Sequence, residues 1–136
     1  MAEPREWRFG LQYLRLEPPN VLWMKCHSTT TLEEAHRVLE VLREQGSQRP
    51  LIGVVDVRGA MLDSEVGNLL AREMKPQWFR AIIYVGAGFL QKALIKTLVV
   101  ALYFNHRWTR EIRYADSEEE ARALVAQLRA HPPRSD

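Results

Sequence analysis

The chain has 136 residues, of which 46% are hydrophobic and 26% are charged, values typical of a soluble globular protein. This length normally makes one domain, and the composition excludes wholesale disorder. The net charge is only +2, from 19 basic and 17 acidic residues, which lacks the large positive excess of nucleic-acid-binding proteins. We therefore expect a single domain over residues 1–136, with a core at about 8–130, frayed termini and no nucleic-acid partner.

The cysteine content and the hydropathy of the chain indicate where in the cell the protein is expected to lie. Cys26 is the only cysteine, which excludes an internal disulfide and a cysteine-based zinc site and fits a reducing environment. The segment MAEPREWRFG lacks the apolar region of a signal peptide. Residues 89–104 are apolar but are interrupted by Lys92 and Lys96 and are shorter than the roughly 20 residues of a membrane span. We expect a cytoplasmic protein without membrane insertion, in which residues 89–104 form a buried helix.

The first elements in chain order are strands. Alternation in WRFGLQYLRLE predicts a strand and places Trp7, Phe9, Leu11 and Tyr13 on strand-like faces, in a register that can slip. The Pro18-Pro19-Asn20 segment predicts a turn, and VLWMKCH predicts a second strand. The two strands are expected to pair as a hairpin.

A helix and a central strand follow. Thr31 and Glu34 form the T-x-x-E pattern of a capping box at the start of TLEEAHRVLEVLREQG, and Gly46 is the predicted stop. The next segment, PLIGVVDVRG, is too apolar to alternate, which is typical of a central strand that is covered on both faces.

The remaining elements alternate helix with strand. A helix is predicted from about Ser64 to Met74 because Pro76 ends it, and Ser117 with Glu120 predicts the capped start of the last helix. Between them lie a strand in WFRAIIYVGAG, a helix from Phe89 to about Asn105 and a short strand in EIRYA. This order predicts an α/β sandwich, with a mixed sheet of about five strands and about four helices.

Several of these features resemble one family. The order of elements, the strand that ends in Asp56, the Asp63-Ser64 pair at a helix start and the closing YADSEEEARALV resemble the STAS domain of anti-sigma-factor antagonists. They are most similar to its SpoIIAA-like branch of small bacterial proteins, which shares a fold theme with SEC14-type lipid-binding domains. The resemblance covers about residues 8–130. It implies a SpoIIAA-like sandwich and a bacterial regulatory role.

The resemblance also implies a site. In the antagonists, the serine after the aspartate is phosphorylated by a partner kinase that is itself the anti-sigma factor, and the matching residue here is Ser64. A phosphate of roughly −1.5 to −2 charges at a helix start would change a docking surface. This chain departs from the family at Glu65 and Val66, where the antagonists have a small residue and then glycine. The implied docking loop comprises Asp56, Arg58, Asp63, Glu65 and Gly67. Helix capping by Asp63 or Ser64 is the alternative reading of the same pair.

A second loop and the absence of catalytic patterns complete the candidate sites. VGAGFLQK joins a strand to a helix, so that Gly86, Gly88 and Lys92 form a candidate anion or ligand loop, although neither common phosphate-binding pattern is present. Tight strand-to-helix packing is the alternative reason for the glycines. The four histidines lack metalloprotease spacing. We expect no enzymatic activity, no metal and no cofactor.

The helix predicted at residues 89–104 is apolar around most of its circumference. Such a helix is either central or meets another subunit or a lipid-like ligand, and for so small a chain we expect a homodimer. The leading hypothesis is therefore a non-enzymatic regulatory domain that binds a protein partner, such as a kinase-like anti-sigma factor. The alternative is a small-molecule or lipid-binding module with an apolar pocket beside this helix.

Overall fold

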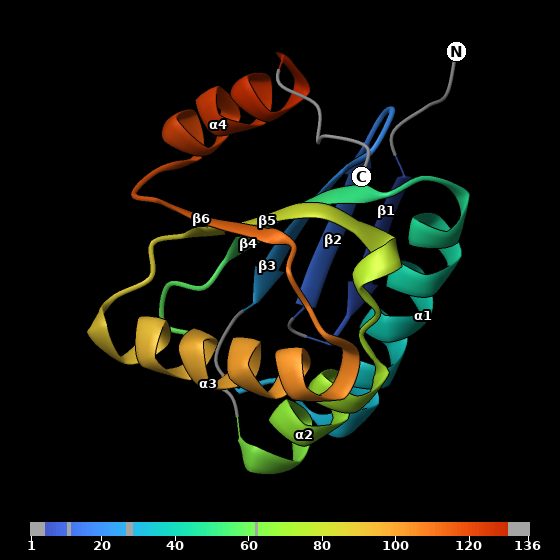
Figure 1. The fold of residues 1–136 in the computed structure, drawn as a ribbon, viewed down its shortest axis with the longest axis vertical. Coiled ribbons are helices and arrows are strands. Elements are labelled where there is room, and N and C mark those ends of the chain that lie inside the picture. Colours follow the sequence, from blue (N-terminus) through green and yellow to red (C-terminus); the bar gives the residue numbers. More distant parts are fainter. Residues whose placement is uncertain (1–4, 11, 27–28, 62, 131–136) are drawn as a thin grey trace.

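The computed structural model describes residues 5–10, 12–26, 29–61 and 63–130, and in these ranges the chain forms one layered α/β domain (Figure 1). Six strands form a single sheet in the order β1-β2-β3-β4-β5-β6: β1 (Arg5–Phe9), β2 (Gln12–Glu17), β3 (Val21–Cys26), β4 (Leu51–Asp56), β5 (Phe79–Val85) and β6 (Glu111–Ala115). The helices are α1 (Leu32–Gln48), α2 (Ser64–Glu73), α3 (Phe89–His106) and α4 (Glu118–Ala130), with a 3-10 turn η1 (Pro76–Trp78) before β5.

The sheet is mixed, as predicted. β1, β2 and β3 pair antiparallel, whereas β3, β4, β5 and β6 pair parallel. Each parallel step needs a crossover helix, and all three crossovers move in the same direction along the sheet. Because such crossovers are right-handed, α1, α2 and α3 lie together on one face. α4 lies on the other face (Figure 1).

The sheet separates two apolar cores. The larger core lies between the sheet and the α1–α3 layer and includes Leu22 and Ile82. The smaller core lies under α4 and includes Ile52 and Ile83. Since alternate residues of β4 and β5 enter opposite cores, both strands are apolar nearly throughout. The prediction of a central strand in PLIGVVDVRG is confirmed.

The capping patterns act as predicted. Thr31 Oγ1 accepts from the backbone N–H of Glu34 at 3.1 Å, and the Glu34 carboxylate accepts from the N–H of Thr31 at 2.9 Å. Ser117 Oγ accepts from the N–H of Glu120 at 3.1 Å at the start of α4. These bonds satisfy backbone donors that the first turn of a helix leaves unpaired.

The first predicted strand is wrong in one respect, because WRFGLQYLRLE forms two strands rather than one. Gly10 has a positive φ of 58°, and Phe9 pairs with Gln12 across the turn. The sheet therefore has six strands instead of about five. The register slips at this turn: Phe9 packs against the larger core, whereas Tyr13 lies on the opposite face of the sheet. Leu11, also named in the predicted pattern, lies outside the described residues.

The predicted stop at Gly46 is also wrong. α1 continues to Gln48, and Gly46 is buried inside it. A Cβ on Gly46 would lie 2.5 Å from the Cβ of Trp78 and 2.9 Å from its Cα. The glycine is therefore explained by the close approach of η1 to the helix, and not by helix termination.

The prediction that residues 89–104 form a buried helix fails within the monomer. In α3 only Ile95 and Leu102 are buried, whereas Phe89 is 95% exposed and Phe104 is 79% exposed. α3 covers the edge of the helical layer beside α2, and its outer side has no neighbour in the described part of the chain. The expected fraying of the termini concerns residues 1–4 and 131–136, which lie outside the described ranges.

Candidate functional site

The predicted docking loop follows β4 and is organised by an ion pair. Asp56 ends β4 and binds Arg58 twice, with Nη2 to Oδ2 at 2.7 Å and Nε to Oδ1 at 3.1 Å, while the Arg58 backbone N–H also donates to Oδ1. Hydrogen bonds from Arg58 lower the pKa of Asp56 despite its partial burial. The Arg58 side chain crosses Gly86, where an added Cβ would lie 2.2 Å from Cγ of Arg58.

Asp63 and Ser64 have distinct positions at the start of α2. Asp63 is the N-cap, and its Oδ1 accepts from the backbone N–H of Val66 at 2.9 Å. Ser64 is the first residue of the helix, and it is exposed, as are Asp63 and Glu65. The loop thus presents the Ser64 hydroxyl to solvent after a strand and at a helix start, with two acids beside it. Gly67 is half-buried in the next turn.

The loop of Gly86, Gly88 and Lys92 has most of its polar groups engaged. Gly88 caps α3, and its N–H donates to Oε1 of Gln91 at 3.1 Å. The Lys92 ammonium lies 5.3 Å from the centre of the Tyr114 ring, a cation–π arrangement. Gly86 has a positive φ of 73° and is overlaid by Arg58. Close packing therefore accounts for Gly86, and anion binding at this loop stays a prediction.

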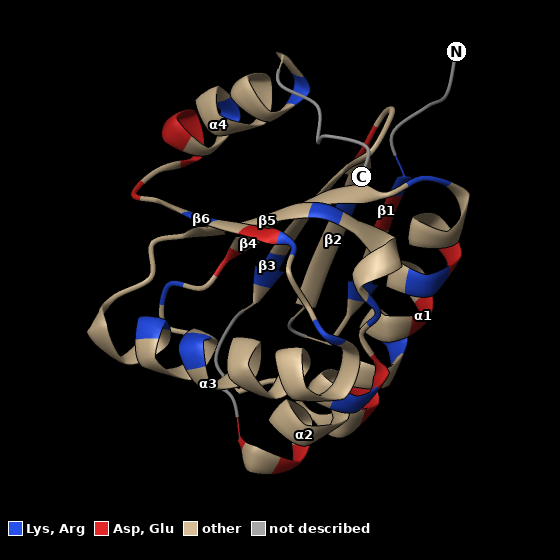
Figure 2. Ribbon diagram, viewed as in Figure 1, with Lys and Arg blue, Asp and Glu red and all other residues tan. Residues whose placement is uncertain are grey.

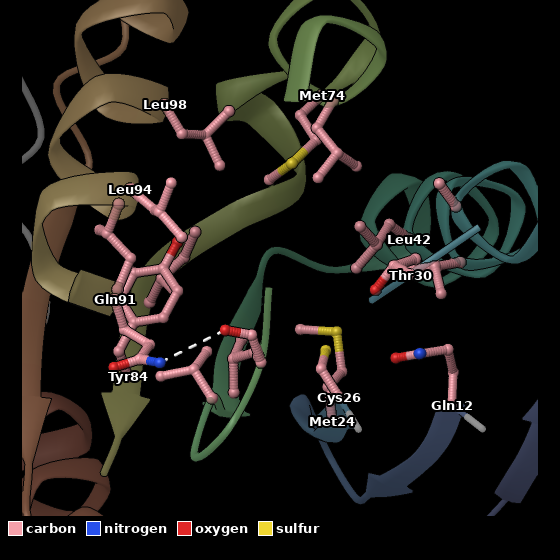
Figure 3. Close-up of a pocket in the computed structure, with 18 of the residues that line it drawn as sticks. Gln12, Met24, Cys26, Thr30, Leu42, Met74, Tyr84, Gln91, Leu94 and Leu98 are labelled. Carbon is pink, nitrogen blue, oxygen red and sulfur yellow. Dashed lines mark hydrogen bonds between the residues drawn. The ribbon is translucent and has the colours of Figure 1, made fainter. Parts of the chain in front are cut away.

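An apolar cavity of about 160 Å³ lies between the sheet and the α1–α3 layer (Figure 3). Its walls come from β2, β3, β4 and β5, from the loops that follow β3 and β4, and from all three helices of the layer. Val57, Ala60 and Met61 belong to the loop after β4, and Met61 is 45% exposed. The cavity therefore reaches the surface near the carboxyl ends of the parallel strands, where α/β sheets commonly bind ligands.

α3 supplies one wall of this cavity. Leu94, Ile95 and Leu98 line it, and Gln91 ties the helix to the loop after β4 by donating from Nε2 to the carbonyl oxygen of Ala60 at 3.3 Å (Figure 3). An apolar cavity does lie beside residues 89–104, as the alternative sequence interpretation required.

The polar groups of the cavity are all uncharged. The described lining contains no aspartate, glutamate, lysine or arginine. Burial, with a smaller contribution from Asp56, raises the pKa of the Cys26 thiol to about 11, and burial also raises the pKa of the Tyr84 phenol. Both groups are therefore protonated and neutral at physiological pH. The cavity suits a neutral, largely apolar molecule.

Sequence reasoning did not single out the residues that line this cavity. Gln12 comes from β2, Thr30 from the loop before α1 and Leu94 from α3, so only the tertiary fold brings them together. The one local signal was Gln12, a polar residue beside Leu14 and Leu16 on the inward face of its strand. That signal was hidden because the turn at Gly10 was read as part of a strand.

A second surface feature is the outer face of α3. Phe89, Val100 and Phe104 are exposed along this face, together with Lys96. Figure 2 shows two basic segments and no acidic segment along the α3 ribbon. No helix of the described residues is long and apolar enough to cross a membrane, and no cluster of three His, Cys, Asp or Glu residues in those ranges could hold a metal.

Comparison with known proteins supports the fold. No profile of a protein family matches the chain, and no curated protein matches it. Among solved structures, it is similar to an uncharacterised protein of the DUF3478 family, with a SpoIIAA-like fold, from Shewanella loihica PV-4. That similarity has a TM-score of 0.57 at 14% identity and covers 92% of this chain and 98% of the other. The protein therefore has a SpoIIAA-like α/β fold, as predicted.

Proposed function

We propose that this protein is a non-enzymatic binding module that holds a small apolar molecule in the cavity beneath α3. The observation that carries the proposal is the cavity itself, with a volume of about 160 Å³ and an uncharged lining. An apolar protein cavity of roughly 150 Å³ is large enough to bind benzene. A compact ring or a short branched chain therefore fits here.

The position of the cavity supports the same function. It opens beside Met61, at the edge of the sheet where loops can change without disturbing the strands. α3, which forms the outer wall, buries only two residues. An outer wall with so few buried residues can move at low cost to admit a molecule.

Native mass spectrometry of the protein purified from its host tests the proposal. We expect a bound mass that is lost on denaturation. Leu94→Trp should abolish it because the larger side chain projects from α3 into the cavity. Ala93→Trp is the matched control, since this neighbouring residue is exposed on the outside of the same helix. A wild-type protein without bound mass, or one whose bound mass survives Leu94→Trp, would contradict the proposal.

Partner docking at the Asp56–Gly67 loop is the second candidate function, and the exposure of Ser64 at the start of α2 favours it. The partner would be a kinase-like protein of the anti-sigma type, and phosphorylation would add charge beside Asp63 and Glu65. Ser64→Ala and Ser64→Asp should change the affinity for a partner recovered by pull-down in opposite directions. Equal affinity of both variants and the wild type would remove the switch.

A further inference from the structure

Gln12 is the polar group that stands out in the apolar cavity. It is only 2% exposed, and it pairs with Phe9 on one side and with Cys26 on the other. The turn at Gly10 places its side chain on the inward face, and Figure 3 shows it reaching toward Cys26 and Met24. Its Nε2 has no hydrogen-bond acceptor in the part of the chain that the structure describes.

An amide donor that is removed from water and left unpaired destabilises a fold. On the α3 side of the cavity, by contrast, both ends of the Gln91 amide are bonded. Gln12, on strand β2, is thus the buried amide of the lining whose donor has no acceptor among the described residues. A molecule in the cavity can supply the missing acceptor.

We propose that Gln12 is the specificity-determining residue of the cavity, and that the ligand is a neutral carbonyl compound whose oxygen accepts a hydrogen bond from Nε2. This inference rests on the proposed binding function and narrows it to a chemical class. The ligand is neutral because the described lining offers no charged group to pair with a carboxylate or an amine. The unpaired atom is an amide donor, which needs an acceptor, and we take a carbonyl oxygen because it is the usual neutral acceptor for an amide N–H in proteins.

Two compounds of nearly the same shape test the inference. Cyclohexanone carries the carbonyl oxygen, and methylenecyclohexane replaces that oxygen by a CH₂ group. Their dissociation constants are measured by NMR titration of the wild type and of Gln12→Met, which keeps the unbranched shape and removes the amide. The preference for the ketone should fall at least about fivefold in Gln12→Met, because one net hydrogen bond is worth about 1 kcal/mol.

Gln45→Met is the matched control. Gln45 is also buried and its Nε2 also lacks an acceptor among the described residues, but it lies on α1 and does not line the cavity. This variant should keep the wild-type preference for the ketone. Cyclohexanecarboxylate is the control for charge and should bind at least tenfold more weakly than cyclohexanone.

The outcomes separate the two proposals. If neither compound binds the wild type, the cavity holds no such ligand, and both this inference and the proposed function fall. If both compounds bind but the preference is the same in Gln12→Met, the binding function stands and the role of Gln12 is overturned. Tighter binding of the carboxylate would overturn the assignment of a neutral ligand. A ketone preference that is lost in Gln12→Met and kept in Gln45→Met supports the inference.

Discussion

Filling the cavity with one methylene group should stabilise the protein. Val55 lies in the central strand β4 and lines the cavity, and it is only partly buried despite its central position. Val55→Ile adds a methylene to this space while keeping the β-branched shape that suits a strand. A buried methylene contributes about 0.8 kcal/mol, and the cavity of about 160 Å³ has room for it. We expect the free energy of unfolding to rise by about 0.8 kcal/mol.

Equilibrium unfolding in urea measures this change, and Val21→Ile is its control. Val21 is a fully buried valine of β3 on the α4 side of the sheet, and it does not line the cavity. There the added methylene has no space and should cost about 1–3 kcal/mol. If Val55→Ile destabilises the protein as much as Val21→Ile does, the cavity is closed in solution and the reasoning is refuted.

Four further substitutions test the structure. Gly46→Ala should lower the free energy of unfolding by about 1–3 kcal/mol, despite the better helix propensity of alanine, because its Cβ would overlap Trp78; an unchanged urea midpoint would contradict that contact. Asp63→Ala should lower the free energy of unfolding by about 1 kcal/mol in the same assay, because it removes the N-cap of α2. A change smaller than a few tenths of a kcal/mol would show that the cap does not stabilise the protein. Arg58 lowers the pKa of Asp56 in the folded protein. The Asp56–Arg58 ion pair therefore stabilises the folded state fully above the ordinary carboxyl pKa of about 4. This stabilisation is lost as the pH falls through the lower pKa that Asp56 has in the folded state. Asp56→Asn should therefore reduce the loss of stability as the pH falls below about 4, and stability curves of variant and wild type that stay parallel in acid would contradict a stabilising role of the pair. If α3 mediates the predicted homodimer, Phe104→Ser should convert the dimer to a folded monomer in sedimentation velocity, because Phe104 is 79% exposed and is not needed for the core. A wild-type protein that is monomeric at every concentration would reject dimerisation.

Local sequence patterns were sufficient to predict the structure of segments whose conformation depends on residues close by in the sequence. The capping residues Thr31 and Ser117 marked the starts of α1 and α4, because the bonds they accept come from backbone groups three residues away. The apolar run of β4 indicated a strand with helices on both sides. These features allowed the α/β fold and its mixed sheet to be predicted.

The features that escaped prediction depend on neighbours that are distant in sequence. Gly46 looked like a helix stop because the approach of Trp78 is not visible near it in the sequence. The apolar composition of α3 suggested burial, but only two residues of that helix are buried, and Phe89 and Phe104 are exposed to solvent. The turn at Gly10 was missed because the residues around it continue an alternating pattern, and the side chain of Gln12 was therefore assigned to no site.

The placement of α1, α2 and α3 on one side of the sheet has a practical consequence for engineering. The frame is formed by the six-stranded sheet and the two cores, while the cavity opens beside the exposed Met61 in the loop after β4. New loop sequences after β3 and β4 could thus be selected from libraries for other small guests, with the underlying scaffold left intact. Substitutions at this opening would change which molecules can enter, whereas substitutions in the lining, such as Val55→Ile, would change both the space for a ligand and the stability of the fold.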